Sequence, residues 1–238
     1  MSLRFTLAAA MALGFAAPAF SQVISLNVVG YYLRPLSPGD NLIANQLLAF
    51  DNSLNTVLSN SLPALPDGAT FTKWSPATGQ LLPLSTYNAA TEAWSINYTL
   101  TGGEGGILHT PAGGTNIFVG GVDSTIINVD TGAYNWHPNY ANGYYLISAP
   151  VPFSSASFQQ VVGRDPLDGE WVKILNEGDQ TYSVTTFHSG SGWDNGVPSL
   201  GLGQAAWFDL GPVDVPEPGT ASLLVFTALG LWLRGRKR

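Results

Sequence analysis

The sequence contains no cysteine among its 238 residues. A disulfide framework, a thiolate metal site and a cysteine nucleophile are therefore excluded, and the folded state has to rely on its core. Charged residues are also scarce, at 11% of the chain against about 25% in an average protein. Because aromatic residues are plentiful, the chain can still bury a hydrophobic core, and global disorder is not expected.

Basic residues are especially rare in the middle of the chain. Between residues 22 and 215, four basic residues face fifteen acidic ones, which gives this segment a net charge of −11. Nucleic-acid binding needs a basic surface that neutralises phosphates, so nucleic acid is not an expected partner. The three histidines, His109, His137 and His188, are not spaced as a local chelating pair. We therefore expect no metal site and no other cofactor.

The N-terminus has the three parts of a secretory signal peptide. Arg4 supplies a positive charge, residues 5–17 form an apolar run, and small residues precede a cleavage point between Ser21 and Gln22. We expect residues 1–21 to form a signal helix that signal peptidase removes after export.

The C-terminus carries a second sorting pattern. Val215, Pro216, Glu217 and Pro218 precede an apolar run over residues 221–233, and a basic cluster closes the chain at Arg234, Arg236, Lys237 and Arg238. A helix of thirteen residues spans about 20 Å, which is short against a hydrocarbon core of about 30 Å. It can lodge in a thinned membrane, with the basic cluster held on the cytoplasmic side.

These last 25 or so residues resemble the PEP-CTERM sorting signal of exported bacterial proteins. The resemblance rests on the Val-Pro-Glu-Pro motif, the short apolar helix and the terminal basic residues, in the right order and spacing. It implies that an exosortase-like enzyme of the membrane recognises residues 216–218 and processes the tail. It implies nothing about the rest of the chain, because the same tail is attached to unrelated domains. A plain C-terminal membrane anchor is the alternative.

The body repeats itself at an offset of about 100 residues. Five short patterns recur in the same order: Leu42–Asn45 as Leu146–Ala149, Asp67-Gly68 as Asp168-Gly169, Ser85–Tyr87 as Thr185–Phe187, Trp94 as Trp193, and Leu100–Gly106 as Leu200–Ala206. Chance can produce one such match but hardly the ordered series. The sequence is also similar in these patterns to uncharacterised duplicated exported proteins, for which no activity is implied.

The repeat predicts a mostly β fold with two homologous, sandwich-like units, each with one short helix. Turn signals place the strands at 41–48, 69–74, 82–87 and 107–109 in the first unit, and at 144–151, 170–175, 181–187 and 205–210 in the second. Ser53 is expected to cap a helix over 54–58, and Ser154 or Ser155 one over 157–162. Residues 22–33 are expected to form a further strand, and 116–135 to link the units with strands of their own.

The predicted organisation therefore has four parts. Residues 1–21 are the signal peptide, 22–121 the first β-rich unit, 122–212 the linker strands with the second unit, and 213–238 the sorting tail with its short transmembrane helix.

Catalytic patterns are weak throughout the body. Gly190-Ser191-Gly192 is a turn signal and not a nucleophile elbow. Glu104 is the most tempting acid for glycoside cleavage, but Gln204 takes its place in the second unit, which indicates that both side chains hydrogen-bond backbone N–H groups. The turn at 176–179 lacks the ligand spacing of a calcium loop. We assign no catalytic residue and expect no enzyme activity.

Aromatic side chains are the remaining candidates for binding. Tyr134, Trp136 and Tyr140 lie in a segment expected to be an exposed loop, and exposed aromatic rings stack on sugars. Trp94 and Trp193 recur in both units and are expected in the core.

The sequence thus predicts an exported structural or adhesive protein of the cell surface or extracellular matrix, held at least transiently in the membrane of the cell envelope. A carbohydrate-binding protein that contacts extracellular polysaccharide is the alternative, and an exported glycoside hydrolase the third possibility.

Overall fold

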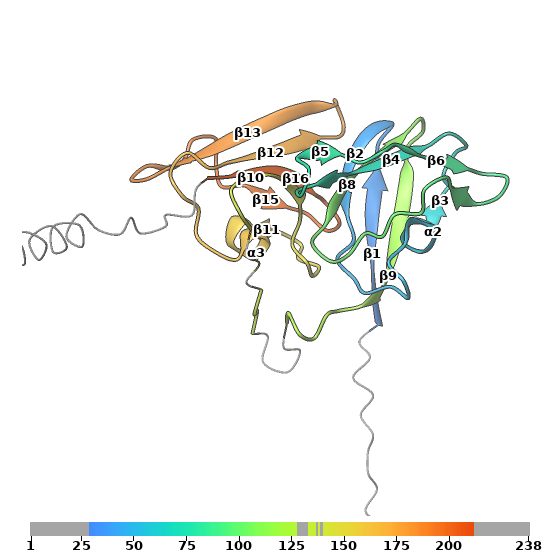
Figure 1. The fold of residues 1–238 in the computed structure, drawn as a ribbon, viewed down its shortest axis with the longest axis horizontal. Coiled ribbons are helices and arrows are strands. Elements are labelled where there is room, and N and C mark those ends of the chain that lie inside the picture. Colours follow the sequence, from blue (N-terminus) through green and yellow to red (C-terminus); the bar gives the residue numbers. More distant parts are fainter. Residues whose placement is uncertain (1–28, 128–132, 137, 139, 212–238) are drawn as a thin grey trace, which may run out of the picture.

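The computed structural model describes residues 29–127, 133–136, 138 and 140–211, and its fold is mostly β, as predicted (Figure 1). Its first half contains β1 (Val29–Leu36), β2 (Gly39–Ala44), α2 (Leu54–Val57), β3 (Ser61–Leu62), β4 (Thr70–Ser75), β5 (Gln80–Leu81), β6 (Ser85–Asn88), β7 (Ala93–Trp94), β8 (Gly105–Thr110) and β9 (Gly114–Gly121). Its second half contains β10 (Gly143–Ile147), β11 (Ala156–Ser157), α3 (Phe158–Val162), β12 (Trp171–Asn176), β13 (Thr181–His188), β14 (Gly192–Trp193), β15 (Ser199–Leu200) and β16 (Ala206–Leu210).

Two larger antiparallel sheets organise the molecule. The first sheet has the strand order β2-β8-β4-β6-β7, with β5 added to β4, and the second sheet has the order β10-β16-β12-β13-β14. A smaller sheet, β1-β9-β3, completes the first half, and β11 pairs with β15 in the second. Figure 1 shows the two halves side by side, coloured blue to green and yellow to red respectively.

The two larger sheets also share their register. Corresponding pairs are Leu42↔Ile107 and Leu146↔Trp207, Phe71↔Leu108 and Val172↔Phe208, Phe71↔Ser85 and Val172↔Thr185, and Tyr87↔Trp94 and Phe187↔Trp193. Each predicted strand of the repeat overlaps one of the observed strands in these sheets. An offset of about 100 residues, the one seen in the sequence repeat, therefore also relates the strand order and the strand pairing of the two sheets.

Each half has its own hydrophobic cluster. In the first half Phe71 and Trp94 are buried together, and in the second Phe208 is buried while Trp193 packs against the cluster from a partly exposed position. The expectation that both tryptophans serve the core is thus confirmed for Trp94 and holds for Trp193 at the edge of its cluster. A third cluster joins the halves; its buried members are Leu42, Ala44, Leu146, Leu175 and Ala205.

The two short helices lie where the sequence predicted, but their caps differ. Ser53 occupies the cap position of α2 without a side-chain hydrogen bond to the helix backbone. The cap of α3 is Ser157, and neither Ser154 nor Ser155. Ser157 forms a capping box with Gln160, in which each side chain bonds the other residue's backbone N–H, and Gly163 ends the helix in the left-handed conformation. The sequence prediction placed the cap two or three residues too early because it did not weigh Gln160.

The segments outside the two larger sheets also differ in part from the prediction. β9 overlaps the start of the predicted linking segment, 116–135, and pairs with β1 and β3. The predicted strand at 22–33 is observed from Val29 onward as β1. The signal peptide and the sorting tail lie outside the described residues. Within the described ranges, no helix is long and apolar enough to span a bilayer.

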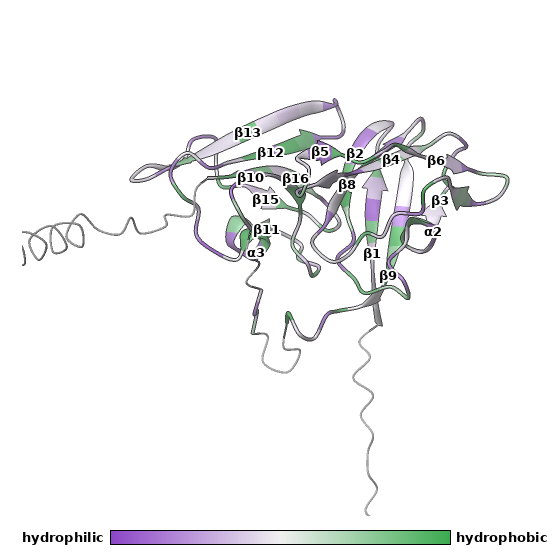
Figure 2. Ribbon diagram, viewed as in Figure 1, coloured by the Kyte–Doolittle hydropathy of each residue, from purple (hydrophilic) through white to green (hydrophobic). Residues whose placement is uncertain are grey.

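The pattern on β13 departs from simple alternation. Tyr182 and Val184 are apolar residues at alternate positions of the strand, but they are 40% and 42% exposed, whereas Thr185 is buried. Figure 2 shows β12 strongly hydrophobic and β13 mostly pale, in keeping with this outer position. Thr185 is tolerated inside because its hydroxyl donates to the carbonyl of Gly196, 3.0 Å away.

Candidate functional site

The two halves are interlocked at corresponding positions of the two larger sheets. Ile43 bridges Gln204, and Ile147 bridges Glu104. The backbone N–H of Ala44 donates to the carbonyl of Gly203 at 2.9 Å, and that of Ser148 donates to Gly103 at 3.0 Å. Each contact thus has a counterpart with the halves exchanged, as in the interface of a two-fold symmetric dimer.

A buried polar network adds contacts that have no counterpart. Gln46, 1% exposed, donates to the hydroxyl of Ser148 at 3.1 Å and accepts from the backbone N–H of Gly203 at 2.9 Å. The Ser148 hydroxyl donates in turn to the carbonyl of Gln204, at 2.6 Å. Because every one of these groups is paired, the network fixes how the halves meet.

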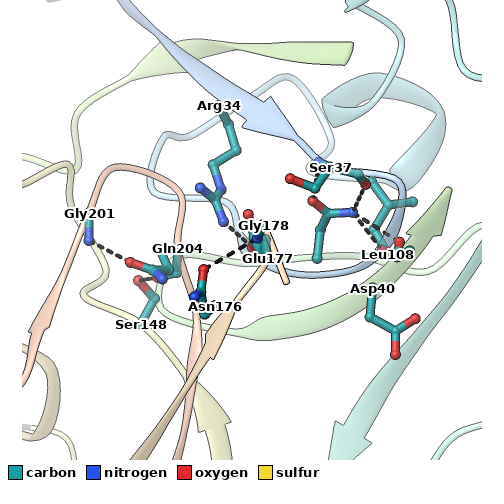
Figure 3. Close-up of polar contacts among 12 residues, drawn as sticks. Arg34, Ser37, Asp40, Leu108, Ser148, Asn176, Glu177, Gly178, Gly201 and Gln204 are labelled. Carbon is teal, nitrogen blue, oxygen red and sulfur yellow. Dashed lines mark hydrogen bonds and ion pairs between the residues drawn. The ribbon is translucent and has the colours of Figure 1, made fainter. Parts of the chain in front are cut away.

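Arg34 and Glu177 form an ion pair between the halves, in which Arg34 Nη2 donates to Glu177 Oε1. Their side chains are only 11% and 12% exposed. Figure 3 shows Arg34 extending from β1 toward Glu177, next to Asn176 and Gly178. Burial raises the pKa of Glu177 against the opposing charge of Arg34, and burial lowers the pKa of Arg34 against the opposing charge of Glu177. In the described part of the chain, Arg34 Nε is the one buried side-chain polar atom without a hydrogen-bond partner.

Close packing surrounds this ion pair. A Cβ placed on Gly203 would lie 2.7 Å from Cε2 of Tyr32 and 3.4 Å from Cδ of Arg34. Tyr32 itself is buried and donates its hydroxyl proton to the carbonyl of Ala44 at 3.0 Å. The Tyr32 ring and the Arg34 side chain therefore fill the space beside the Gly203 turn, and we call this filled place the plug.

The corresponding place in the other half is a cavity of about 240 Å³. It lies against the Gly103 turn, which corresponds to the Gly203 turn of the plug. Its described lining comprises Lys73, Trp74, Pro76, Gly102–Gly105, Trp136, Pro138, Tyr140 and Tyr145–Ile147. We call it the interface cavity.

Equivalent residues of the plug and the cavity can be found by counting back from a pair of equivalent glycines, one in each half. Gly39 and Gly143 begin β2 and β10 and pair with Thr110 and Leu210, the last residues of β8 and β16. Five residues before each glycine stand Arg34 and Pro138, and seven before stand Tyr32 and Trp136.

The same comparison holds for the acid of the plug. Glu177 directly follows β12, and Pro76 directly follows β4, the corresponding strand of the first sheet. Both members of the buried ion pair are thus replaced by proline in the cavity, and a proline ring cannot fill the volume of either charged side chain. The cavity therefore exists because no side chains equivalent to Arg34 and Glu177 fill this space.

Lys73 and Glu104 supply the charges of the interface cavity. Lys73 Nζ donates to Glu104 Oε2 and to the carbonyl of Thr99, each at 2.8 Å. Glu104 Oε2 also accepts from the backbone N–H of Thr101 at 2.9 Å. Burial works against ionisation of Glu104, but the Lys73 and Thr101 hydrogen bonds outweigh it and lower the pKa. Glu104 is therefore ionised at neutral pH.

Four aromatic residues line the cavity: Trp74, Trp136, Tyr140 and Tyr145. The indole N–H of Trp74 donates to the carbonyl of Tyr144 at 2.6 Å, and that of Trp136 to the carbonyl of Val161 at 3.0 Å. Trp74 also packs edge-on against Trp207 with 5.3 Å between the ring centroids. Burial raises the pKa of Tyr140, with smaller contributions from Tyr145 and Glu104, so its hydroxyl stays protonated at neutral pH. Fixed rings of this kind are preorganised for binding.

Two of the three residues that were predicted to stack on sugars lie at the interface cavity, and the third does not. Trp136 and Tyr140 line the interface cavity from a segment outside the named strands, and both side chains are partly exposed. Tyr134 is not among the lining residues: its hydroxyl donates to the carbonyl of Gln160, and its ring packs against Phe153 with the centroids 5.4 Å apart. Trp74 and Lys73 also line the cavity, but they were not predicted as site residues. No local sequence pattern indicates them, because the Arg34–Glu177 pair that Pro138 and Pro76 replace is visible only in the structure.

The predicted equivalence of Glu104 and Gln204 is confirmed. Gln204 accepts from the backbone N–H of Gly201 at 3.0 Å (Figure 3). Glu104 accepts from the backbone N–H of Thr101 in the same way. Both side chains therefore close the same turn, as the sequence suggested.

Other candidate positions are engaged locally. His109 and Asp40 form an exposed pair, with His109 Nδ1 2.8 Å from Asp40 Oδ1. No group of three or more potential metal-binding side chains occurs among the residues described in the structure. The sorting motif Val215–Pro218, the cleavage site Ser21–Gln22 and the basic residues Arg234, Arg236, Lys237 and Arg238 lie outside those residues.

Comparison with known proteins does not extend this description, since no protein-family model, no curated protein and no solved structure matches the chain.

Proposed function

We propose that the protein is an exported, non-enzymatic component of the bacterial cell surface or extracellular matrix, delivered by an exosortase-like system. The observation that carries this proposal is the order of features at the C-terminus: the Pro216–Pro218 motif, an apolar run and then a basic cluster. The signal-peptide pattern over residues 1–21 supports export independently. Signal peptidase, the exosortase-like enzyme and the membrane are the implied partners.

The body suits such a role as a rigid scaffold. We propose that its two units arose by duplication of one ancestral unit. Identical strand order and register in the two larger sheets support this, as do the exchanged contacts between the halves. The Gln46 network then fixes the two units to each other, so the body can be displayed on the surface without a disulfide.

A carbohydrate-binding role is the second candidate, and the interface cavity favours it. Aromatic side chains make up much of its described lining, and one ion pair, Lys73–Glu104, supplies the charged groups. A glycoside hydrolase needs two facing carboxylates, and among the described lining residues Glu104 is the one acid. The cavity therefore supports binding better than cleavage.

Two variants of the full chain test the sorting proposal in the native cell. Deletion of residues 215–238 removes the motif and the membrane segment together, so we expect the protein to leave the cell envelope and accumulate in the medium. Replacement of Pro216, Glu217 and Pro218 by alanine keeps the apolar run and the basic cluster. We expect this matched variant to remain in the membrane as a longer, unprocessed chain.

Cell fractionation with an antibody against the body distinguishes the outcomes. If the deletion variant stays in the envelope, the sorting proposal is wrong. If the alanine variant has the same size and location as the wild type, the tail is a plain anchor and the exosortase-like enzyme has no part in sorting.

A further inference from the structure

We infer that the interface cavity is a binding site for one neutral pyranose ring, such as the terminal residue of an extracellular polysaccharide. This goes beyond the sorting proposal, and its test does not depend on export or tail processing. The inference starts from the comparison of the cavity with the plug. The same architecture is filled by Tyr32, Arg34 and Glu177 in one place and left open by Trp136, Pro138 and Pro76 in the other.

The interface cavity is partly open to solvent, since the Glu104 side chain on its wall is 43% exposed. Its aromatic walls therefore lack the packing contacts that the plug makes at the corresponding place, and these contacts are available to a ligand. The chain has a way to fill this space, because it does so in the plug. Loss of the filling side chains together with retention of ordered aromatic walls is the pattern expected of a place that takes up a ligand.

The size of the cavity limits the ligand. Sites for drug-sized molecules measure about 300–1,000 Å³. The interface cavity, at about 240 Å³, is smaller. It therefore fits a molecule no larger than a single sugar ring with its hydroxyl groups, or the end residue of a longer chain that continues into solvent.

The charges of the cavity select a neutral ligand. Lys73 neutralises Glu104, the one carboxylate among the described lining residues, so a quaternary ammonium group finds no unpaired negative charge between the aromatic rings. An anion would have to approach a body whose net charge between residues 22 and 215 is −11. The Lys73–Glu104 pair is neutral as a whole and offers both a donor and an acceptor to a ligand's hydroxyl groups.

The hydrogen bonds already made leave room for such contacts. Lys73 uses two of its three donors, for Glu104 and Thr99. Glu104 Oε2 accepts from Lys73 Nζ and from the backbone N–H of Thr101, and the Glu104 side chain is 43% exposed, so a ligand's hydroxyl group can reach the carboxylate. A pyranose ring combines an apolar C–H face with a rim of hydroxyls. Its face matches Trp74, Trp136 and Tyr140, and its rim matches the ion pair.

The test transplants the plug into the cavity. The double variant Pro76→Glu/Pro138→Arg places the Glu177–Arg34 pair at the corresponding positions of the purified full chain. A matched control, Ala90→Arg/Thr91→Glu, introduces the same two charges at an exposed turn. Isothermal titration uses the methyl glycosides of glucose, galactose, mannose and N-acetylglucosamine, with tetramethylammonium chloride and inorganic phosphate as charged probes.

We expect saturable binding of at least one methyl glycoside to the wild type and to the control, and at least tenfold weaker binding to the plugged variant. Circular dichroism and unfolding curves show whether the plugged variant is folded. If it is not, Glu104→Gln replaces it, because Gln204 shows that glutamine can close the same turn. This variant should also bind the glycoside more weakly.

Three results would overturn the inference. If none of the four glycosides shows saturable binding, the ligand of the cavity is not a neutral pyranose. Equal affinity of the wild type and the folded plugged variant, or of the wild type and Glu104→Gln, places the binding elsewhere. Preferential binding of tetramethylammonium or phosphate shows that the site is selective for charge.

Discussion

Arg34→Met tests whether the buried ion pair of the plug holds the two halves together. Methionine keeps most of the length and apolar surface of arginine but removes its charge, so Glu177 is left in a site where its side chain is only 12% exposed. Removing one partner of a buried pair costs about 3–5 kcal/mol, because the remaining charge is uncompensated. We expect a loss of that size in the free energy of unfolding at neutral pH.

Removal of both charges should restore most of the stability. In Arg34→Met/Glu177→Leu no charge remains buried, and the unpaired Nε of Arg34 is also gone. Replacing a buried ion pair by apolar side chains is often neutral or stabilising. We therefore expect the double variant to lie within about 1 kcal/mol of the wild type or above it.

The pH dependence of the single variant follows from the raised pKa of Glu177. A carboxyl group whose pKa is higher in the folded than in the unfolded state favours folding below the unfolded value and loses that contribution as pH rises through the folded value. Loss of Arg34 removes the charge that opposes this shift. The cost of Arg34→Met should therefore be small below pH 4.5, the ordinary value for glutamate, and grow as pH rises above it.

Urea unfolding followed by tryptophan fluorescence measures these differences at each pH. His109→Gln is the matched control, because the His109–Asp40 pair is about half exposed and should contribute at most about 1 kcal/mol. If Arg34→Met costs no more than this control at neutral pH, or if its cost does not depend on pH, the reasoning about the plug is refuted.

The helix caps give two further predictions, measured by the same unfolding assay. Ser157→Ala removes the capping box with Gln160 and should cost about 1 kcal/mol. Ser53→Ala should cost only a few tenths of a kcal/mol, because the Ser53 side chain makes no hydrogen bond to the helix backbone and only a long one, 3.4 Å, to the Thr56 hydroxyl. Equal costs for the two serines would contradict the difference between the two caps.

Much of the fold could be predicted from turn chemistry and repetition. Asp67-Gly68 and Asp168-Gly169 form the same turn, in which each aspartate accepts a backbone N–H from residues 89 and 189 respectively. Because such turns fix where strands begin, the neighbouring strands were predicted to within a few residues. The shared role of Glu104 and Gln204 could likewise be predicted, since both residue types accept backbone hydrogen bonds.

Other features depended on neighbours that local patterns do not reveal. On β13, Tyr182 and Val184 are partly exposed while Thr185 is buried, so alternation alone does not assign a side to the apolar residues of this strand. β3 and β9 carry no counterpart in the repeat; β9 pairs with both β1 and β3, and tertiary packing sets these pairings.

The interface cavity could not be predicted from the sequence for a similar reason. Its walls come from segments up to about 70 residues apart in sequence, and its existence depends on an absent pair of side chains. The aromatic residues alone could suggest binding, and two of the three proposed positions, Trp136 and Tyr140, do line the cavity. Only the three-dimensional structure separates Tyr134, which packs against Phe153, from these two residues.

Terminal peptide mapping by mass spectrometry, on protein recovered from its native cell envelope, tests the central claim of export and sorting most directly. The account predicts a chain that begins at Gln22 and ends near residues 216–218. A chain that still begins at Met1 and ends at Arg238 would contradict both signal-peptide cleavage and exosortase-like processing.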